Sequence, residues 1–425
     1  MRSIKRLSAL LLALFILLPA GAAFASGEEA AGGDIIPSDA PALPDVEMAL
    51  LYEESTDTLL YAKDIETRNE PASMTKVMTA MLVLEHDGDL SGTYTVPADA
   101  VSAQYCSWME RVHLLVGEEL KVYDLMEYLL VASGNEAATT LAMYVTGNIP
   151  AFVKKMNEKA VELGMMNTHY ADPHGLSTHS SISSADMLTL ARYAMQNPLF
   201  RQLVATRSGR LPANSIRKEA ITYNTTNRVM SPRSTPAYMT NFSDDIIGIK
   251  TGSTRDAGYN LSACMVKGDL TFYSVVMQGR EVERRGSTLY SHYLSTIELF
   301  RYAQGFEKTG FTAGSEILRT SMQGSKTADL PLTIEEDLFI LAQEGEQIFA
   351  ETHLEKIGRR VEAGQIVGML TLRDAFGNVR ETPLVAMESI AVPFTLPPAV
   401  SGAGCVLVLV AFIMLRKKEK QGKKA

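Results

Sequence analysis

No feature of this 425-residue sequence constrains its fold more than three short motifs: Ser73-Met-Thr-Lys76, Ser133-Gly-Asn135 and Lys250-Thr-Gly252. The first begins a predicted helix, the second lies where a helical pattern breaks, and the third ends an apolar, strand-like run. A fold that uses all three must bring a helix start, a helix–helix turn and a strand end to one cleft. Each motif is common by chance, but together they are typical of an active-site serine acyl-transferase that needs neither histidine nor metal.

The first motif pairs a nucleophile with a base. Ser73 and Lys76 lie three residues apart on the predicted helix, so both side chains project from the same face. Lysine serves as a base for serine if burial or a nearby cation disfavours its ammonium form. The helix N-terminus favours negative charge near Ser73, whose backbone N–H would form an oxyanion hole with that of Ser253. Taken alone, the pair is more typical of a helix-capping serine and a surface lysine.

The second and third motifs complete this hypothesis. Ser133 would relay a proton to a leaving amine and Asn135 would hold a substrate amide, although serine, glycine and asparagine also suit an ordinary turn. Lys250 would supply a second cation that lowers the pKa of Lys76 and attracts a substrate carboxylate. Gly252 would allow a substrate backbone to approach the strand.

The hydrophobic pattern predicts an α+β fold in which helices flank an antiparallel sheet. An apolar hairpin and a set of helices precede three short apolar runs, and the turn Lys267-Gly-Asp269 joins the last two runs. The predicted elements are a hairpin at 48–61, helices at 73–86, 122–146 (two), 150–164 and 184–196, strands at 246–251, 258–266 and 271–278, and a closing helix at 283–302.

Residues 311–395 differ from the rest of the chain in their predicted secondary structure. Short strand-like runs and a turn at Asp374-Ala-Phe-Gly377 predict a small all-β domain. No cluster of catalytic residue types lies there, so we expect a spacer or partner-binding role.

The two ends of the chain have the patterns of targeting segments. Residues 1–25 have the basic start, short apolar core and small-residue cleavage site of a secretory signal peptide, and 26–44 are expected to be a flexible leader. Residues 399–415 carry no charge and precede the basic tail 416–425, which is typical of a single transmembrane anchor with a cytoplasmic tail. An uncleaved N-terminal anchor and an interfacial C-terminal helix are the alternatives. We therefore expect a single-pass cell-membrane protein whose catalytic domain is extracytoplasmic.

The charge of the chain argues against one class of partner. The net charge is −9 although both end segments are basic, so the part between them is still more acidic. An acidic surface does not favour binding to nucleic acid. Of the three cysteines, Cys405 lies in the predicted anchor, while Cys106 and Cys264 could pair outside the cell. A buried strand position explains Cys264 equally well, so the pairing stays open.

Longer stretches extend the three motifs: Pro71–Ala80, Leu129–Ala138, Asp172–Leu176, Gly248–Thr254 and Ala257–Leu261. Through them the chain resembles the serine-type D-alanyl-D-alanine carboxypeptidases, the low-molecular-mass penicillin-binding proteins of the DD-peptidase and serine β-lactamase-like superfamily. The resemblance covers about residues 40–305, in which we place a catalytic domain at 45–305. It reaches less specifically over 311–395.

The resemblance implies removal of the terminal D-alanine from peptidoglycan pentapeptide stems through an acyl-enzyme, and acylation by penicillins and other β-lactams. Ser73 would be the acylated nucleophile and Lys76 its base. Ser133 would assist proton transfer and Asn135 would align the substrate. Lys250 and Thr251 would contact the terminal carboxylate. The implied substrate-binding residues are Asn135, Lys250, Thr251, Gly252, Ser253 and, from the element Thr226-Asn-Arg228, Arg228.

Other functions remain to be weighed against this one. A serine β-lactamase would need a dedicated deacylating base, for which no clear candidate is found, and a catalytically silent penicillin- or muropeptide-binding protein would keep the motifs with Lys76 misplaced. The residues that a zinc peptidase would draw on are His169, Asp172, His174 and His179. Their spacing does not suit a helical zinc pair, and no glutamate base accompanies them. We expect no metal or cofactor, and we expect His174 to order a loop near the cleft.

Overall fold

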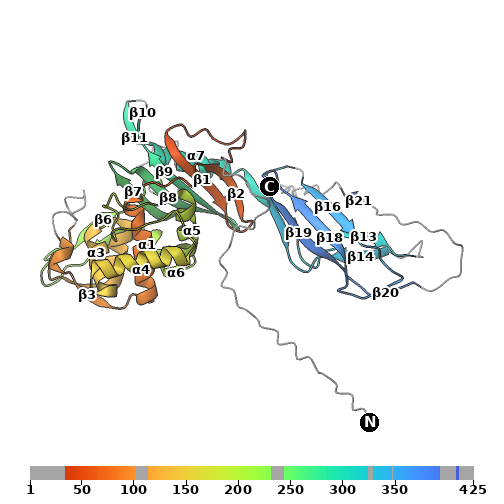
Figure 1. Ribbon diagram of the computed structural model, residues 1–425, viewed down its shortest axis with the longest axis horizontal. Coiled ribbons are helices and arrows are strands. Elements are labelled where there is room, and N and C mark those ends of the chain that lie inside the picture. The colour runs from red at the N-terminus through yellow and green to blue at the C-terminus, as the bar shows by residue number, and fades with distance from the viewer. Residues whose placement is uncertain are drawn as a thin grey trace, which may run out of the picture.

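The computed structural model describes residues 34–101, 113–230, 244–284, 286–323, 329–346, 348–392 and 408–410. The first part of the chain is built on a five-stranded antiparallel sheet in the order β2-β1-β9-β8-β7 (Figure 1). The hairpin and the three later strands predicted from the sequence are confirmed. These strands are β1 (Val46–Glu53), β2 (Thr58–Lys63), β7 (Ile246–Thr254), β8 (Gly258–Lys267) and β9 (Leu270–Gly279).

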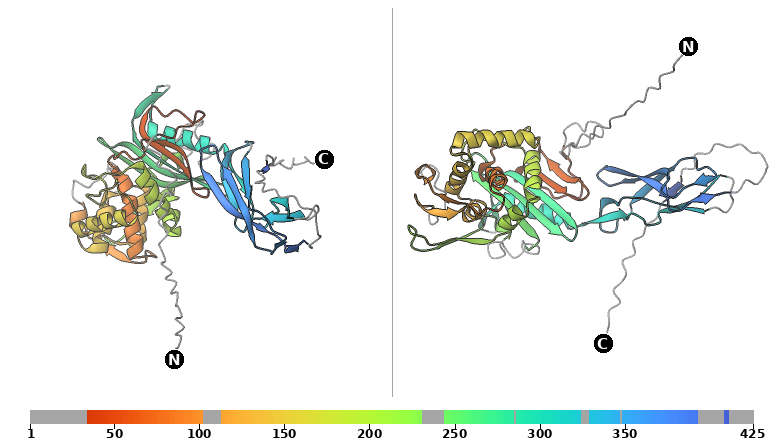
Figure 2. Two further views of the ribbon diagram at one scale, coloured as in Figure 1. Left: turned by 45° about the vertical axis from the view of Figure 1, so that its right-hand side comes forward. Right: turned by 90° about the horizontal axis from the view of Figure 1, so that it is seen from below.

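Helices cover both faces of this sheet. They are α1 (Lys76–His86), α2 (Val122–Val131), α3 (Asn135–Thr146), α4 (Ile149–Glu162), α5 (Ser184–Met195), α6 (Pro198–Val204) and α7 (Ser291–Ala303). α7 packs on one face and the other helices gather on the opposite side (Figures 1 and 2). Successive side chains of β1 therefore enter different cores. Leu50 shares a core with Val77 of α1, and Leu51 shares one with Phe300 of α7.

The helices predicted at 122–146, 150–164 and 184–196 are confirmed by α2 to α5. α6 is absent from the sequence prediction, although its start carries a recognisable signal. The Asn197 side chain accepts hydrogen bonds from the N–H groups of Leu199 and Phe200, and a proline follows it. The shorter elements of this part are η2 (Ala98–Val101), β3 (Thr93–Thr95), β4 (Glu119–Lys121), β5 (Ser208–Leu211) and β6 (Ile221–Asn224).

The single closing helix predicted at 283–302 is wrong in its first part. Residues 281–290 form a hairpin of β10 (Glu281–Arg284) and β11 (Ser287–Tyr290), and the helix begins only at Ser291. Gly286 at the hairpin turn has a φ of +74°, which a helix cannot contain. The hairpin projects beyond the edge of the main sheet (Figure 1).

Two further predictions near the N-terminus need correction. The first long helix begins at Lys76, not at Ser73, because residues 72–75 form a 3-10 turn, η1 (Ala72–Thr75). Part of the predicted flexible leader is ordered: the backbone of Ile35 pairs with Ala62, and Leu43 is buried. Apolar side chains in the leader give it surface to bury against the sheet.

Residues 306–391 form the predicted all-β domain, which extends away from the helices (Figure 2). It has its own core, and the ring of Phe376 meets that of Phe306 where the two parts join. The turn predicted at 374–377 is confirmed, and Gly377 in it has a φ of +85°. The strands are β12 (Phe306–Phe311), β13 (Leu318–Ser321), β14 (Asp329–Thr333), β15 (Leu338–Gln343), β16 (Phe349–Leu354), β17 (Arg360–Val361), β18 (Ile366–Arg373), β19 (Val379–Ala386) and β20 (Ile390–Ala391).

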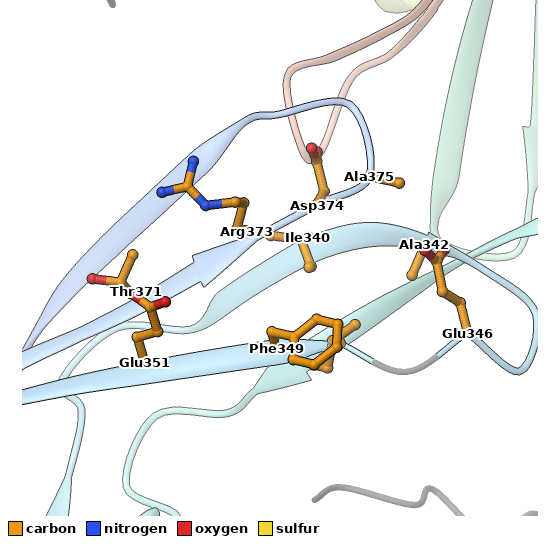
Figure 3. Close-up of a pocket in the computed structure, with 10 residues that line it drawn as sticks. Ile340, Ala342, Glu346, Phe349, Glu351, Thr371, Arg373, Asp374 and Ala375 are labelled. Atoms are coloured by element: carbon orange, nitrogen blue, oxygen red, sulfur yellow. The ribbon is translucent and has the colours of Figure 1, made fainter. Parts of the chain in front are cut away.

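A pocket of about 340 Å³ opens in the all-β domain, where side chains from β15, β16 and β18 converge (Figure 3). Phe349, Arg373 and Ile340 are among the residues that line it (Figure 3). None of the residues predicted for the active site lines this pocket.

Several predictions fall outside the described residues: the signal peptide, the basic tail, Cys106 and Cys405. Of the predicted anchor at 399–415, the structure describes only β21 (Val408–Val410), a strand paired with β16 where a helix is predicted. None of the helices in the described ranges has the length and apolar character that crossing a bilayer requires. Cys264 is buried and carries a free thiol.

Candidate active site

The first two motifs meet at Lys76. This residue begins α1, and its side chain is fully buried. Its Nζ lies 2.7 Å from the Oγ of Ser73 and 2.8 Å from the Oδ1 of Asn135, the first residue of α3. A hydroxyl, an amine and an amide from two distant segments are therefore in direct hydrogen-bond contact.

The surroundings of Lys76 make it a usable base. Burial lowers the pKa of Lys76 to about 7, and the negative charges of Asp172 and Glu136 oppose this lowering without cancelling it. Burial, rather than the charge of Lys250 expected from the sequence, is the main cause. A neutral amine within hydrogen-bond distance of a hydroxyl can accept its proton.

The loop between α4 and α5 supplies a third partner for Lys76. The carbonyl of His174 accepts a hydrogen bond from its Nζ at 2.8 Å. The Asp172 carboxylate organises the loop by accepting from the N–H groups of His174, Gly175 and Ser177. Burial opposes ionisation of Asp172, but the His174 side chain and these donors outweigh it and lower the pKa to about 2. The expectation that His174 orders a loop near the cleft is confirmed.

Gly175 lets this loop touch the turn that carries Ser73. Its φ is +85°, and a Cβ at this position would lie 1.7 Å from the carbonyl oxygen of Ala72. Ala72 itself has a φ of +46°, which is uncommon for a residue with a side chain. Because Ala72 directly precedes Ser73, the close approach at Gly175 helps to set the position of the hydroxyl.

The third motif lies on β7, an edge strand that packs against η1. Lys250 is 1% exposed, and burial together with the positive charge of Lys76 holds the pKa of Lys250 well below its usual range. Gly252 makes a close contact within the protein, and its expected role toward a substrate backbone stays a prediction. A Cβ there would lie 2.6 Å from the carbonyl oxygen of Pro71, so the glycine allows β7 to pack against the turn that bears Ser73.

Thr251 and Thr226 are in contact although the sequence separates them. The Oγ1 of Thr226 is 2.6 Å from the Oγ1 of Thr251 on β7. Arg228 begins the turn η3 (Arg228–Met230), is exposed, and holds its guanidinium 5.3 Å from the centre of the Tyr290 ring. The element at 226–228 therefore lies beside the third motif.

The catalytic role predicted for Ser133 and the oxyanion-binding role predicted for Ser253 stay predictions. Ser133 is half-buried between α2 and α3 with a φ of +64°, and a Cβ on Gly134 would lie 2.4 Å from the Tyr128 ring. Ser253 is exposed on β7, opposite Tyr259 of β8.

One charged neighbour of the site, Glu136, is not among the residues predicted from the sequence. This carboxylate is fully buried beside Asn135, and its Oε1 lies 3.2 Å from the Nδ1 of His113. The sequence around this single glutamate contains no pattern that predicts its burial. Among the residues that the structure describes, no group of histidine, cysteine, aspartate and glutamate side chains is placed to hold a metal ion.

The chain is similar to known proteins over most of its length. Residues 38–281 match the model of a family described as D-alanyl-D-alanine carboxypeptidase. The chain is 27% identical to D-alanyl-D-alanine carboxypeptidase DacF of Bacillus subtilis (strain 168), over 91% of this chain and 94% of that protein. Penicillin binding protein 6B of Escherichia coli is similar in structure, with 25% identity and a TM-score of 0.60 over 83% of this chain and 99% of that one.

Proposed function

Because this chain belongs to the D-alanyl-D-alanine carboxypeptidase family, we propose that it releases the terminal D-alanine of peptidoglycan stem peptides through an acyl-enzyme on Ser73. One observation carries the assignment of Ser73. A buried lysine amine, Lys76, with a pKa lowered to about 7, lies 2.7 Å from its hydroxyl. The chain is a serine peptidase, and this pair supplies the nucleophile and the base that such an enzyme requires.

The reaction proceeds in two halves. The Oγ of Ser73 attacks the carbonyl carbon between the last two D-alanines while Lys76 accepts the hydroxyl proton. The C–N bond then breaks, Ser133 passes the proton to the departing amine, and free D-alanine leaves. Water attacks the resulting ester, which yields the shortened stem and restores Ser73.

The remaining site residues orient the substrate. Asn135 holds the amide of the stem, and the N–H groups of Ser73 and Ser253 stabilise the oxyanion. Lys250 and Thr251 receive the terminal carboxylate. A β-lactam carries a strained amide and a carboxylate in a similar arrangement, so it acylates the same serine.

Incubation of the purified protein with a pentapeptide ending in D-Ala-D-Ala tests this function. We expect free D-alanine, and a penicillin adduct that mass spectrometry locates on Ser73, with neither product from Ser73→Ala. A stable adduct without D-alanine release would favour a penicillin-binding protein without turnover. Fast penicillin hydrolysis without D-alanine release would indicate a β-lactamase.

The lowered pKa of Lys76 predicts how acylation depends on pH. With a pKa of about 7, roughly a tenth of this amine is neutral at pH 6 and nine tenths at pH 8. Since only the neutral amine can accept the proton of Ser73, we expect the acylation rate to rise about tenfold between these pH values and then level off. The measurement is the second-order rate constant for acylation by penicillin at each pH. A rate constant that does not change from pH 6 to pH 8 would contradict the role of Lys76 as the base.

We also propose that the enzyme works outside the cytoplasmic membrane, which residues 399–415 span. The support is the uncharged run followed by the basic tail 416–425, together with the signal-like segment 1–25. Membrane fractionation tests it: the full chain should sediment with membranes, and a chain that ends at residue 395 should not. Equal distribution of the two proteins would refute the anchor.

A further inference from the structure

The turn at residues 225–228 joins the two sides of the site. The side chain of Asn227 donates a hydrogen bond to the carbonyl of Gly248 on β7 at 2.7 Å. The backbone N–H of Thr226 donates to the carbonyl of Val131 at the end of α2 at 3.0 Å. The turn is therefore fixed both to the strand of the third motif and to the helix that precedes the second motif.

Tyr293, in the first turn of α7, holds the same turn from a third direction. Its hydroxyl donates a hydrogen bond to the carbonyl of Thr226 at 2.8 Å. Burial raises the pKa of Tyr293 to about 12, so the hydroxyl keeps the proton that this arrangement needs. This side chain therefore holds the backbone of the turn just before Asn227.

Thr226 transmits this constraint to the third motif. Its N–H and its carbonyl are both engaged, so its Oγ1 has a defined position, 2.6 Å from the Oγ1 of Thr251. Arg228, two residues further on, holds its guanidinium over the ring of Tyr290. The hydroxyl of Thr251 therefore contacts a turn that Tyr293 helps to hold.

We infer that Tyr293 is a positioning residue for recognition of the terminal carboxylate of the substrate. Its hydroxyl holds Thr226, whose Oγ1 contacts that of Thr251. This inference rests on the proposed function, because it takes Thr251 as a group that receives the carboxylate. The Tyr293 hydroxyl bonds to the backbone of the turn, so its removal changes selectivity for the carboxylate more than the attack by Ser73.

A pair of reactive substrates separates these effects: N-acyl-D-alanyl thioesters whose leaving groups are thioglycolate, which carries a carboxylate, and ethanethiol, which does not. In both, Ser73 attacks the thioester carbonyl and the thiol leaves. Tyr293→Phe removes only the hydroxyl. We expect kcat/KM for the thioglycolate ester to fall by roughly 3- to 10-fold, the effect of one lost hydrogen bond, and kcat/KM for the ethanethiol ester to stay near wild type.

Matched variants keep this test decisive. Tyr302→Phe, on the same helix, removes a hydroxyl that lies 3.4 Å from Asp39 and should leave both esters unaffected. Thr226→Val should reproduce the selective loss and Thr226→Ser should restore selectivity, which tests the relay even if Tyr293→Phe folds poorly. Equal losses on both esters, or no loss on either, would overturn the inference. A wild-type protein that releases no D-alanine would instead refute the proposed function.

Discussion

Replacing Lys76 with methionine is expected to slow acylation of Ser73 by roughly 10²- to 10⁴-fold, the range that a positioned general base contributes. Methionine fills a similar volume but cannot accept the hydroxyl proton. The Oδ1 of Asn135 and the carbonyl of His174 also lose their donor, which loosens the second motif. The measurement is kcat/KM for D-alanine release together with the rate constant for penicillin acylation.

The control for this variant is Lys154→Met, which removes an exposed lysine of α4 that lies 3.6 Å from Glu158. It should retain wild-type kinetics, since surface ion pairs contribute little. Thermal unfolding of both variants separates chemistry from folding. If Lys76→Met kept more than about a tenth of the activity at an unchanged melting temperature, another group would have to be the base.

Replacing Gly175 with alanine is expected to lower the free energy of unfolding by about 2–5 kcal/mol and to displace Ser73. The new Cβ would lie 1.7 Å from the carbonyl oxygen of Ala72, which is backbone and cannot rotate away. The positive φ of 175 adds strain for any residue with a side chain. Urea unfolding gives the stability change, and penicillin labelling reports whether the nucleophile remains in place.

Gly164→Ala is the matched control for Gly175→Ala. Gly164 has a φ of +75°, but a Cβ there would meet no atom within 4 Å. This variant therefore measures the cost of the left-handed backbone alone, about 1 kcal/mol. Equal destabilisation of the two variants, with full penicillin labelling of both, would show that the contact with Ala72 does not position Ser73.

The regular spacing of apolar residues made most of the main sheet and its helices predictable. A helix or strand with one buried face carries apolar residues at fixed intervals along the sequence. The hairpin of β10 and β11 was not predictable from this spacing. Its charged residues also suit a surface helix, and the sign of its turn in the sequence is the single glycine Gly286. The predicted start of α1 was three residues too early, because the local sequence does not distinguish an α-helix from the 3-10 turn that carries Ser73.

The sequence by itself determined the chemical groups of this protein: a serine with a lysine three residues on, then an SGN turn, then a KTG strand end. Only the tertiary structure decided what makes them reactive. Burial, and not a second cation, lowers the pKa of Lys76, and Gly175 and Gly252 permit the contacts that place Ser73. Desolvation and close packing depend on atoms brought together from distant segments, and no local pattern of residues encodes them.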